Sequence, residues 1–170
     1  MRRAIPVVLG ALVLALTGAC TPSIPIPPPG PTDAEKLAAA EALDQRFLEA
    51  FNKGDAEALA ATYWNSPKLV SFGPEGMGTV GWDAAKAGVA GMFKAMPGAK
   101  LENLSHHNDV HGDAVLGWGT FKMTIPTPGG SQVIEGRYTD VKMMHDGKWV
   151  YVMDHASVPV PPPPPEPVKK

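Results

Sequence analysis

One stretch near the C-terminal end decides the fold: GRYTDVKMMHDGKWVYVMDHAS, residues 136–157. Within it, runs rich in Val, Tyr, Trp and Met flank the dipeptide Asp146-Gly147. Asp-Gly between two such runs is the strongest short-range signal for a type I′ hairpin, because both turn positions need a positive φ. The sequence therefore predicts a β-hairpin that turns at these two residues.

The same turn predicts the register of the hairpin. If His145 pairs with Lys148, counting outward places Tyr138 opposite His155. Directly opposed residues share a face of a sheet, so one face should carry Tyr138, Asp140, Trp149, Tyr151, Met153 and His155. The other face should carry Arg137, Thr139, Val141, Met143, Val150, Val152 and Asp154. We expect the first face to line a ligand pocket, because it combines most of the aromatic area with a few polar groups.

Composition indicates one globular domain between two proline-rich ends. The chain has 170 residues, of which 44% are hydrophobic and 19% charged, with a formal net charge of -2. That balance argues against a nucleic-acid-binding protein, which would carry a basic stripe. Most of the 19 prolines lie before Thr32 or after Val158, which places the domain at residues 32–158 and a proline-rich tail at residues 159–170. A single cysteine excludes an internal disulfide.

The N-terminal segment has the features of an export signal. Arg2 and Arg3 precede a short apolar run at residues 7–16, which is typical of a secretory signal peptide. The following residues, LTGAC at 16–20, resemble the bacterial lipobox. That resemblance implies a signal peptide over residues 1–19, cleavage before Cys20, lipid on its thiol, and a proline-rich tether over residues 20–31. The membrane would then be a partner through Cys20, on the periplasmic side of the outer membrane in a Gram-negative host. The alternative is an ordinary signal peptide with a chance cysteine.

Apolar periodicity predicts two helices after the tether. Thr32 or Asp33 can cap the first, whose apolar residues recur at intervals of three and four up to Phe51. Gly54 is expected to end this helix in the left-handed conformation, and Asp55 to cap a second helix that ends near residues 64–65. A short strand at 68–73, a third helix at 82–96, and strands at 100–110 and 114–125 should precede the last hairpin. Gly117 and Gly119 in the second of these strands suggest a bend or a bulge.

The segment QRFLEAFNKGDAEALAATYW, residues 45–64, resembles the opening of SnoaL-like domains in the nuclear transport factor 2-like superfamily, which includes ketosteroid isomerase. With the closing DGKWVYVMDHAS, the resemblance covers most of residues 35–158. It implies an α+β, cystatin-like cone in which a curved antiparallel sheet wraps around three N-terminal helices and leaves an open-ended pocket. The expected ligand-binding residues are Phe47, Tyr63, Trp82, Trp118, Trp149, Tyr151 and Met153.

The best candidate for chemistry is an acid/base pair on the hairpin. In the expected register Asp140 and His155 are diagonal neighbours, with Tyr138 as a nearby donor, and a carboxylate that orients an imidazole is typical of general bases. The alternative is a structural network that joins two strands. The isomerase's catalytic tyrosine and aspartate base fall at Phe47 and near Ser71, so only Asp140 matches the resemblance. We therefore expect a ligand-binding envelope module without a cofactor, with a His155–Asp140 isomerase, lyase or hydrolase as the alternative.

Two further features carry weaker expectations. His107, Asp109 and His111 alternate onto one side of a strand and could hold a metal, but the spacing fits no established zinc pattern, so no metal is expected. The resemblance also implies a homodimer formed through the exposed sheet face, which would include Val141, Val150 and Val152.

We predict that Cys20 anchors the chain to a membrane. Incorporation of a labelled fatty acid should be lost in Cys20→Ser, and the variant should move from the membrane fraction to the soluble fraction, because the lipid supplies the apolar area that holds the protein in the bilayer. A Cys20→Ser protein that partitions with membranes as the parent does would contradict the lipobox interpretation.

Overall fold

The computed structural model describes residues 30–74 and 78–159. By its contacts the chain divides into two units, Met1–Gly30 and Pro31–Lys170, and every element below belongs to the second. The predicted signal peptide, Cys20, nearly all of the tether and the tail from residue 160 lie outside the described residues. Within the described ranges, no helix is long and apolar enough to cross a membrane.

The first two helices begin and end where their capping residues stand. Helix α1, Asp33–Lys53, starts at a capping box formed by Thr32 and Glu35 and ends at Gly54, whose φ is 70°. Helix α2, Ala56–Ala60, starts at Asp55, whose side chain accepts from the backbone N–H of Ala58. Helix α2 is shorter than predicted because residues 62–64 turn to pair with strand β6, Lys148–Ser157, through the backbone of Tyr151.

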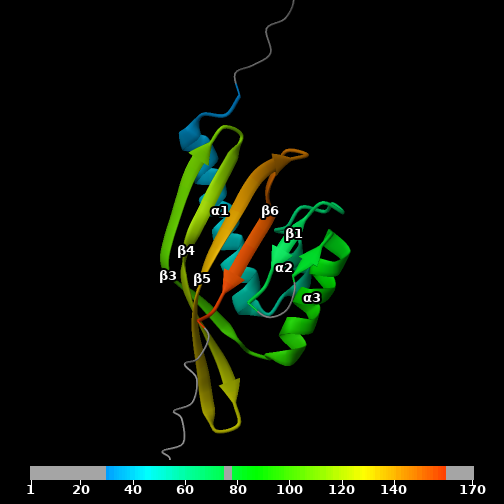
Figure 1. Cartoon of the computed structure of the whole chain (residues 1–170), viewed down its shortest axis with the longest axis vertical. Helices are drawn as coiled ribbons and strands as arrows, with labels where there is room; N and C mark the ends of the chain where they lie inside the picture. Colours follow the sequence, from blue (N-terminus) through cyan, green and yellow to red (C-terminus); the bar gives the residue numbers. More distant parts are fainter. Residues whose placement is uncertain (1–29, 75–77, 160–170) are drawn as a thin grey trace, which may run out of the picture. The chain divides into compact units, whose positions relative to one another are not determined.

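The strands form one mixed sheet in the order β2-β1-β6-β5-β4-β3. Helix α3, Trp82–Ala95, follows β2 in the chain. Figure 1 shows α1 behind strands β4, β5 and β6, and α1 packs against β3, β4 and β6. The α+β architecture is confirmed, although the sheet is not wholly antiparallel, since β1 pairs parallel with β6. The strands are β1 Val70–Phe72, β2 Thr79–Val80, β3 Lys100–His111, β4 Ala114–Thr127, β5 Gly130–His145 and β6 Lys148–Ser157.

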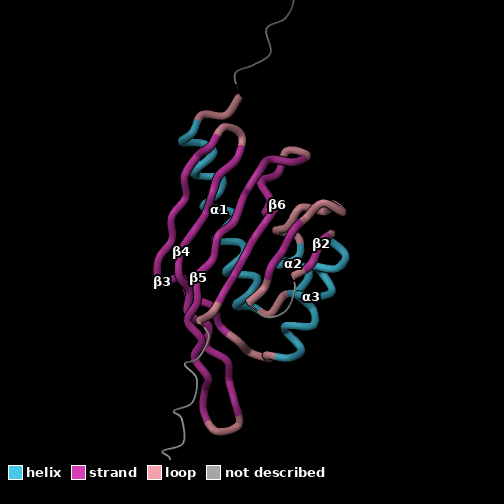
Figure 2. The backbone as a smooth tube through the Cα atoms, viewed as in Figure 1, coloured by secondary structure: helices cyan, strands magenta, loops and turns pink. Residues whose placement is uncertain are grey.

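The predicted hairpin turn is confirmed. Asp146 and Gly147 have φ values of 50° and 74°, and His145 pairs with Lys148. The predicted register holds as far as Lys142, which lies opposite Tyr151. Figure 2 follows the long β5–β6 pair from this turn.

Beyond that point the predicted register is wrong, because β6 contains a bulge at Val152. Val141 pairs with Met153, so Asp140 lies opposite Asp154 and Thr139 lies opposite His155. One extra residue exchanges the faces for the rest of the strand. Met153 and His155 therefore lie on the outer face, away from α1, and Asp154 lies on the inner face with Asp140.

The core between the helices and the inner face of the sheet has two clusters. The first includes Leu43, Tyr63, Trp149 and Tyr151, and the second includes Phe51, Leu59, Phe121, Met123 and Ile125. Phe47 packs against both, and its ring meets those of Tyr63 and Tyr151 edge-on at centroid distances of 6.2 and 5.6 Å.

The outer face carries two of the three valines of the predicted dimer contact, Val141 and Val150. Val141 is partly buried, Val150 is 9% exposed, and Val152 stands in the bulge. A homodimer through this face remains a proposal.

Candidate functional site

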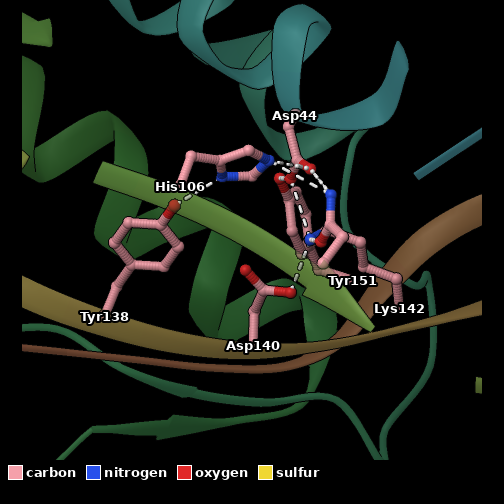
Figure 3. A network of polar contacts seen from close by, with 7 residues as sticks. Asp44, His106, Tyr138, Asp140, Lys142 and Tyr151 are labelled. Atoms are coloured by element: carbon pink, nitrogen blue, oxygen red, sulfur yellow. Dashed lines mark hydrogen bonds and ion pairs between the residues drawn. The ribbon is translucent and has the colours of Figure 1, made fainter. Parts of the chain in front are cut away.

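A fully buried lysine lies at the centre of the inner face. Lys142 on β5 is 0% exposed, and its Nζ lies 3.0 Å from Asp44 Oδ1 on α1 and 2.8 Å from Asp140 Oδ1 (Figure 3). The ammonium also donates to Asn108 Oδ1 at 2.7 Å, and the hydroxyl of Tyr151 donates to Asp44 Oδ1 at 2.5 Å. Burying an ammonium is costly unless carboxylates compensate its charge, and here two do so. We use the name polar cluster for the seven residues Asp44, His106, Asn108, Tyr138, Asp140, Lys142 and Tyr151.

Two glycines on β4 make room for this cluster between β3 and β5. Gly117 lies opposite Asp140 and Gly119 lies opposite Tyr138. A Cβ at Gly117 would stand 2.4 Å from Asp140 Oδ1 and 2.5 Å from Lys142 Nζ. A Cβ at Gly119 would stand 2.8 Å from the Tyr138 oxygen and closer still to a backbone carbonyl of β3. The bulge that these glycines predicted in their own strand lies instead in the neighbouring strand β3, between residues 103 and 105. In β4 the two glycines leave the space that the polar side chains fill.

The more accessible end of the cluster is a chain of three side chains from α1, β3 and β5. His106 Nε2 lies 3.2 Å from Asp44 Oδ2, and its Nδ1 lies 2.6 Å from the Tyr138 hydroxyl. Because the Lys142 ammonium can only donate, the Asn108 oxygen must face it, and the Asn108 amide N–H then donates to Asp44 Oδ2 at 2.9 Å. Burial raises the pKa of Tyr138, so its hydroxyl keeps its proton and can donate to Nδ1. With the proton on Nε2, Asp44 accepts from it in the arrangement that orients a general base; with the proton on Nδ1, Nε2 instead accepts from the Asn108 amide, 3.1 Å away.

A second pair of carboxyl groups lies where the bulge brings Asp154 opposite Asp140. Burial, with the charges of Asp44 and Asp154, raises the pKa of Asp140 to about 6, against the lowering effect of the Lys142 ammonium. Burial also raises the pKa of Asp154, against the lowering effect of the Ser71 hydroxyl and of the Tyr63 hydroxyl, which donates to Asp154 Oδ2 at 2.6 Å. Asp154 Oδ1 is buried and has no hydrogen-bond partner in the described part of the chain. The inner face thus holds two carboxyl groups that lose their protons at a higher pH than an ordinary aspartic acid does.

The structure separates the predicted acid/base pair. Asp140 and Tyr138 lie on the inner face and His155 on the outer face, so Asp140 and His155 do not meet. Among the predicted ligand-binding residues, Phe47, Tyr63, Trp149 and Tyr151 lie in or against the inner core, and the Trp82 indole donates to the carbonyl of Ala60 at 3.2 Å. Trp118 and Met153 lie on the outer face, 43% and 37% exposed.

Sequence reasoning did not find Asp44, His106, Asn108 or Lys142 as site residues. The signal was present at Lys142, which the predicted register already placed opposite Tyr151 on an apolar face. The two glycines that alternate on the neighbouring strand were the second signal, because a lysine there needs space as well as counter-charges.

The weak metal candidates lie on the outer side of β3. His111 Nε2 is 3.0 Å from Asp109 Oδ2, and His107 stacks on Trp118. Across residues 30–74 and 78–159, no group of three or more His, Cys, Asp and Glu side chains is arranged to hold a metal ion.

We predict that Lys142→Met lowers the free energy of unfolding by about 3–5 kcal/mol at pH 7, because Asp44 and Asp140 would stay buried without a counter-charge. Urea denaturation measures the change. Lys148→Met is the matched control, since this exposed lysine is in the same hairpin and its loss should cost less than about 0.5 kcal/mol. Equal stabilities of the two variants would show that the polar cluster does not depend on its cation.

A second prediction concerns pH. The pKa of Asp140 is about 6 in the fold against an ordinary 3.8, a difference worth about 3 kcal/mol. Between these values the folded chain keeps a proton that the unfolded chain has lost, so this stabilisation is present below pH 4 and is lost as the pH rises to 6. Asp140→Asn should flatten that decline in denaturation curves at pH 4, 5, 6 and 7. The exposed Asp113→Asn serves as control, and an unchanged decline in Asp140→Asn would contradict the assignment.

Comparison with known proteins agrees with this architecture. The sequence matches the family model of the SnoaL-like domain over residues 45–152. No curated protein matches the chain.

Several solved structures are similar in fold. A cystatin-like protein from Caulobacter vibrioides is 22% identical, with a TM-score of 0.63 over 74% of this chain and 90% of its own. A proposed dehydratase of the nuclear transport factor 2-like family from Streptomyces avermitilis is 18% identical, with a TM-score of 0.69 over 76% of this chain and 100% of its own. A proposed scytalone dehydratase from Novosphingobium aromaticivorans is 17% identical, with a TM-score of 0.64 over 74% and 85%. The chain therefore belongs to the family of SnoaL-like domains.

Proposed function

We propose that the domain binds a small molecule of mixed polarity at the His106–Tyr138 end of the polar cluster. The observation that carries this proposal is a gradient of exposure: the side chain of Lys142 is fully buried and that of Asp44 9% exposed, whereas that of His106 is 27% exposed. A polar ligand group can therefore reach an imidazole whose orientation is already set by Asp44 and Tyr138. A site of this kind, with a few fixed polar groups beside apolar side chains, is typical of small-molecule recognition.

The apolar part of such a ligand has a surface beside Tyr138. Tyr138 packs against the second core cluster, together with other partly buried side chains from β3, β5 and β6, among them Leu101, Ile134 and Ala156. These groups can cover an apolar ring while His106 and Tyr138 bind its polar group. The ligand class that fits is a largely apolar molecule with one carbonyl or hydroxyl group.

Acid/base catalysis is the second candidate function. The Asp44–His106–Tyr138 chain supports it, because Asp44 holds one imidazole nitrogen and a substrate that displaces the Tyr138 hydroxyl would meet the other as a base. Two of the similar structures are proposed dehydratases. Elimination of water needs a base that takes a proton from carbon, which is the role proposed here for the imidazole. Asp140 and Asp154, with their raised pKa values, could return a proton to a leaving group.

The place of action remains a proposal from the sequence. Lipid on Cys20 would anchor the domain in the cell envelope, with the membrane as its partner, and a homodimer would form through the outer face. No nucleic-acid partner is proposed, in keeping with the net charge of -2.

One apolar ketone, 2-tetralone, tests both candidates on the full chain. Calorimetric titration should give saturable binding that is at least tenfold weaker in Tyr138→Phe, which removes the hydroxyl that turns to donate to the carbonyl, and in His106→Ala, which removes the imidazole that positions this hydroxyl. His111→Ala, an exposed histidine at the end of the same strand, is the matched control and should bind as the parent does. Absence of saturable binding, or binding indifferent to His106 and Tyr138, would overturn the proposed site.

The same samples in D₂O distinguish a binding module from an enzyme. Exchange of the α-protons of 2-tetralone, followed by proton NMR, should match the buffer rate if the site only binds. Exchange above that rate that is lost in His106→Ala would select the acid/base function.

A further inference from the structure

A hollow lies on the outer face of the sheet, and Tyr138 of the polar cluster is among the residues that line it. It has a volume of about 340 Å³ and spans strands β3 to β6. Besides Gly119 and Tyr138, which pair with each other, the strand register arranges its lining in two rows of residues that lie side by side across the sheet. The first row is His107, Trp118, Thr139 and His155, and the second is Ser105, Thr120, Arg137 and Ser157.

The first row places aromatic side chains on both sides of a small residue. Trp118 is 43% exposed, and its ring stacks on His107 at a centroid distance of 5.5 Å and an angle of 21°. On the other side, His155 meets Phe72 edge-on at 6.2 Å. Trp118 and His155 flank the β5 residue Thr139, so their backbones are two strand spacings apart, about 10 Å. A flat ring above Thr139 would lie roughly 5 Å from each side, within the range of about 4.5–7 Å at which aromatic rings attract.

The second row supplies a cation and hydroxyl groups. The Arg137 Nε–H donates to Ser157 Oγ at 3.2 Å, which leaves the other guanidinium N–H groups for a ligand. Within the described residues no carboxylate lies within ion-pair distance of Arg137, and none lines the hollow. Ser105 and Thr120 add hydroxyl groups that are 2.9 Å apart. The charge of the lining is therefore positive or neutral throughout.

We propose that this hollow binds a flat aromatic molecule that carries an anionic group. The ring lies above Thr139 between Trp118 and His155, and the anion binds the guanidinium of Arg137. Planar guanidinium and a carboxylate, sulfonate or phosphate form strong paired hydrogen bonds, and the aromatic side chains give the ring its affinity. The two rows lie on the face opposite to the polar cluster, because neighbouring residues of β5 point to opposite faces of the sheet, and Tyr138 is the residue that both sites share.

The test compares 2-naphthoate with 2-naphthamide, which has the same ring and no charge, by calorimetric titration of the full chain. We expect the parent to bind 2-naphthoate at least tenfold tighter than 2-naphthamide. Arg137→Gln should abolish that difference, and Trp118→Ala should weaken the binding of both probes at least fivefold.

Two matched controls isolate the hollow. Arg46→Gln removes an exposed arginine elsewhere, and Trp64→Ala removes an indole that stacks on His145 at 4.3 Å but does not line the hollow. Both should bind 2-naphthoate as the parent does.

Three results would overturn the proposal. One is equal affinity of the parent for the two probes, and another is a charge preference that survives in Arg137→Gln. The third comes from sedimentation: a dimer that Trp118→Ala converts to monomer, without naphthoate binding by the parent, would identify the hollow as a contact between two copies of the chain.

Discussion

The structure depends most on the charge of Lys142. One ammonium lies between a carboxylate of α1 and a carboxylate of its own strand, and an amide of β3 accepts its hydrogen bond. The interaction therefore joins α1 to the middle of the sheet. Apolar packing alone would fix neither the position of this helix along the strands nor its angle to them. Because a buried ammonium tolerates few arrangements of its partners, it favours one docking of α1 over the alternatives that an apolar face would allow. Along β4, the polar cluster lies between the first core cluster, which includes Val115, and the second, which includes Phe121.

The bulge at Val152 decides which chemistry each face of the sheet carries. Without the extra residue, Asp154 would leave the inner face and His155 would take its place. With it, the inner face gains a second buried carboxyl group, and an imidazole joins Trp118, Thr139 and Arg137 outside. The one extra residue in β6 thus places some ionisable groups of the hairpin on the inner face of the sheet and others on the outer face.

Local signals in the sequence predicted the local structure well. Thr32, Gly54 and Asp55 mark helix ends through chemistry that involves only a few neighbouring residues, and Asp146-Gly147 does the same for the hairpin turn. Register far from a turn is different, because Val152 resembles the residues beside it and nothing in its chemistry indicates that it would stand unpaired. The polar cluster was missed for a related reason. Asp44, His106 and Lys142 are distant in the sequence, and each alone looks like an ordinary surface residue until the fold brings them together.

The central position of β6 in the sheet delays folding of the domain until this last strand is present. The last strand to be synthesised pairs with β5 on one side, and on the other it pairs in parallel with β1 and contacts residues 62–64. Strand β6 therefore joins the β1–β2 pair to the β3–β4–β5 part of the sheet. Helix α1, which contacts β6, cannot complete its packing before β6 has been synthesised. Pairings between residues so far apart in the sequence slow folding, because the chain loses the entropy of closing a long loop before the stabilising contacts form. Until β6 has been synthesised, β1 and β2 therefore have no strand in the described part of the chain that joins them to β3, β4 and β5.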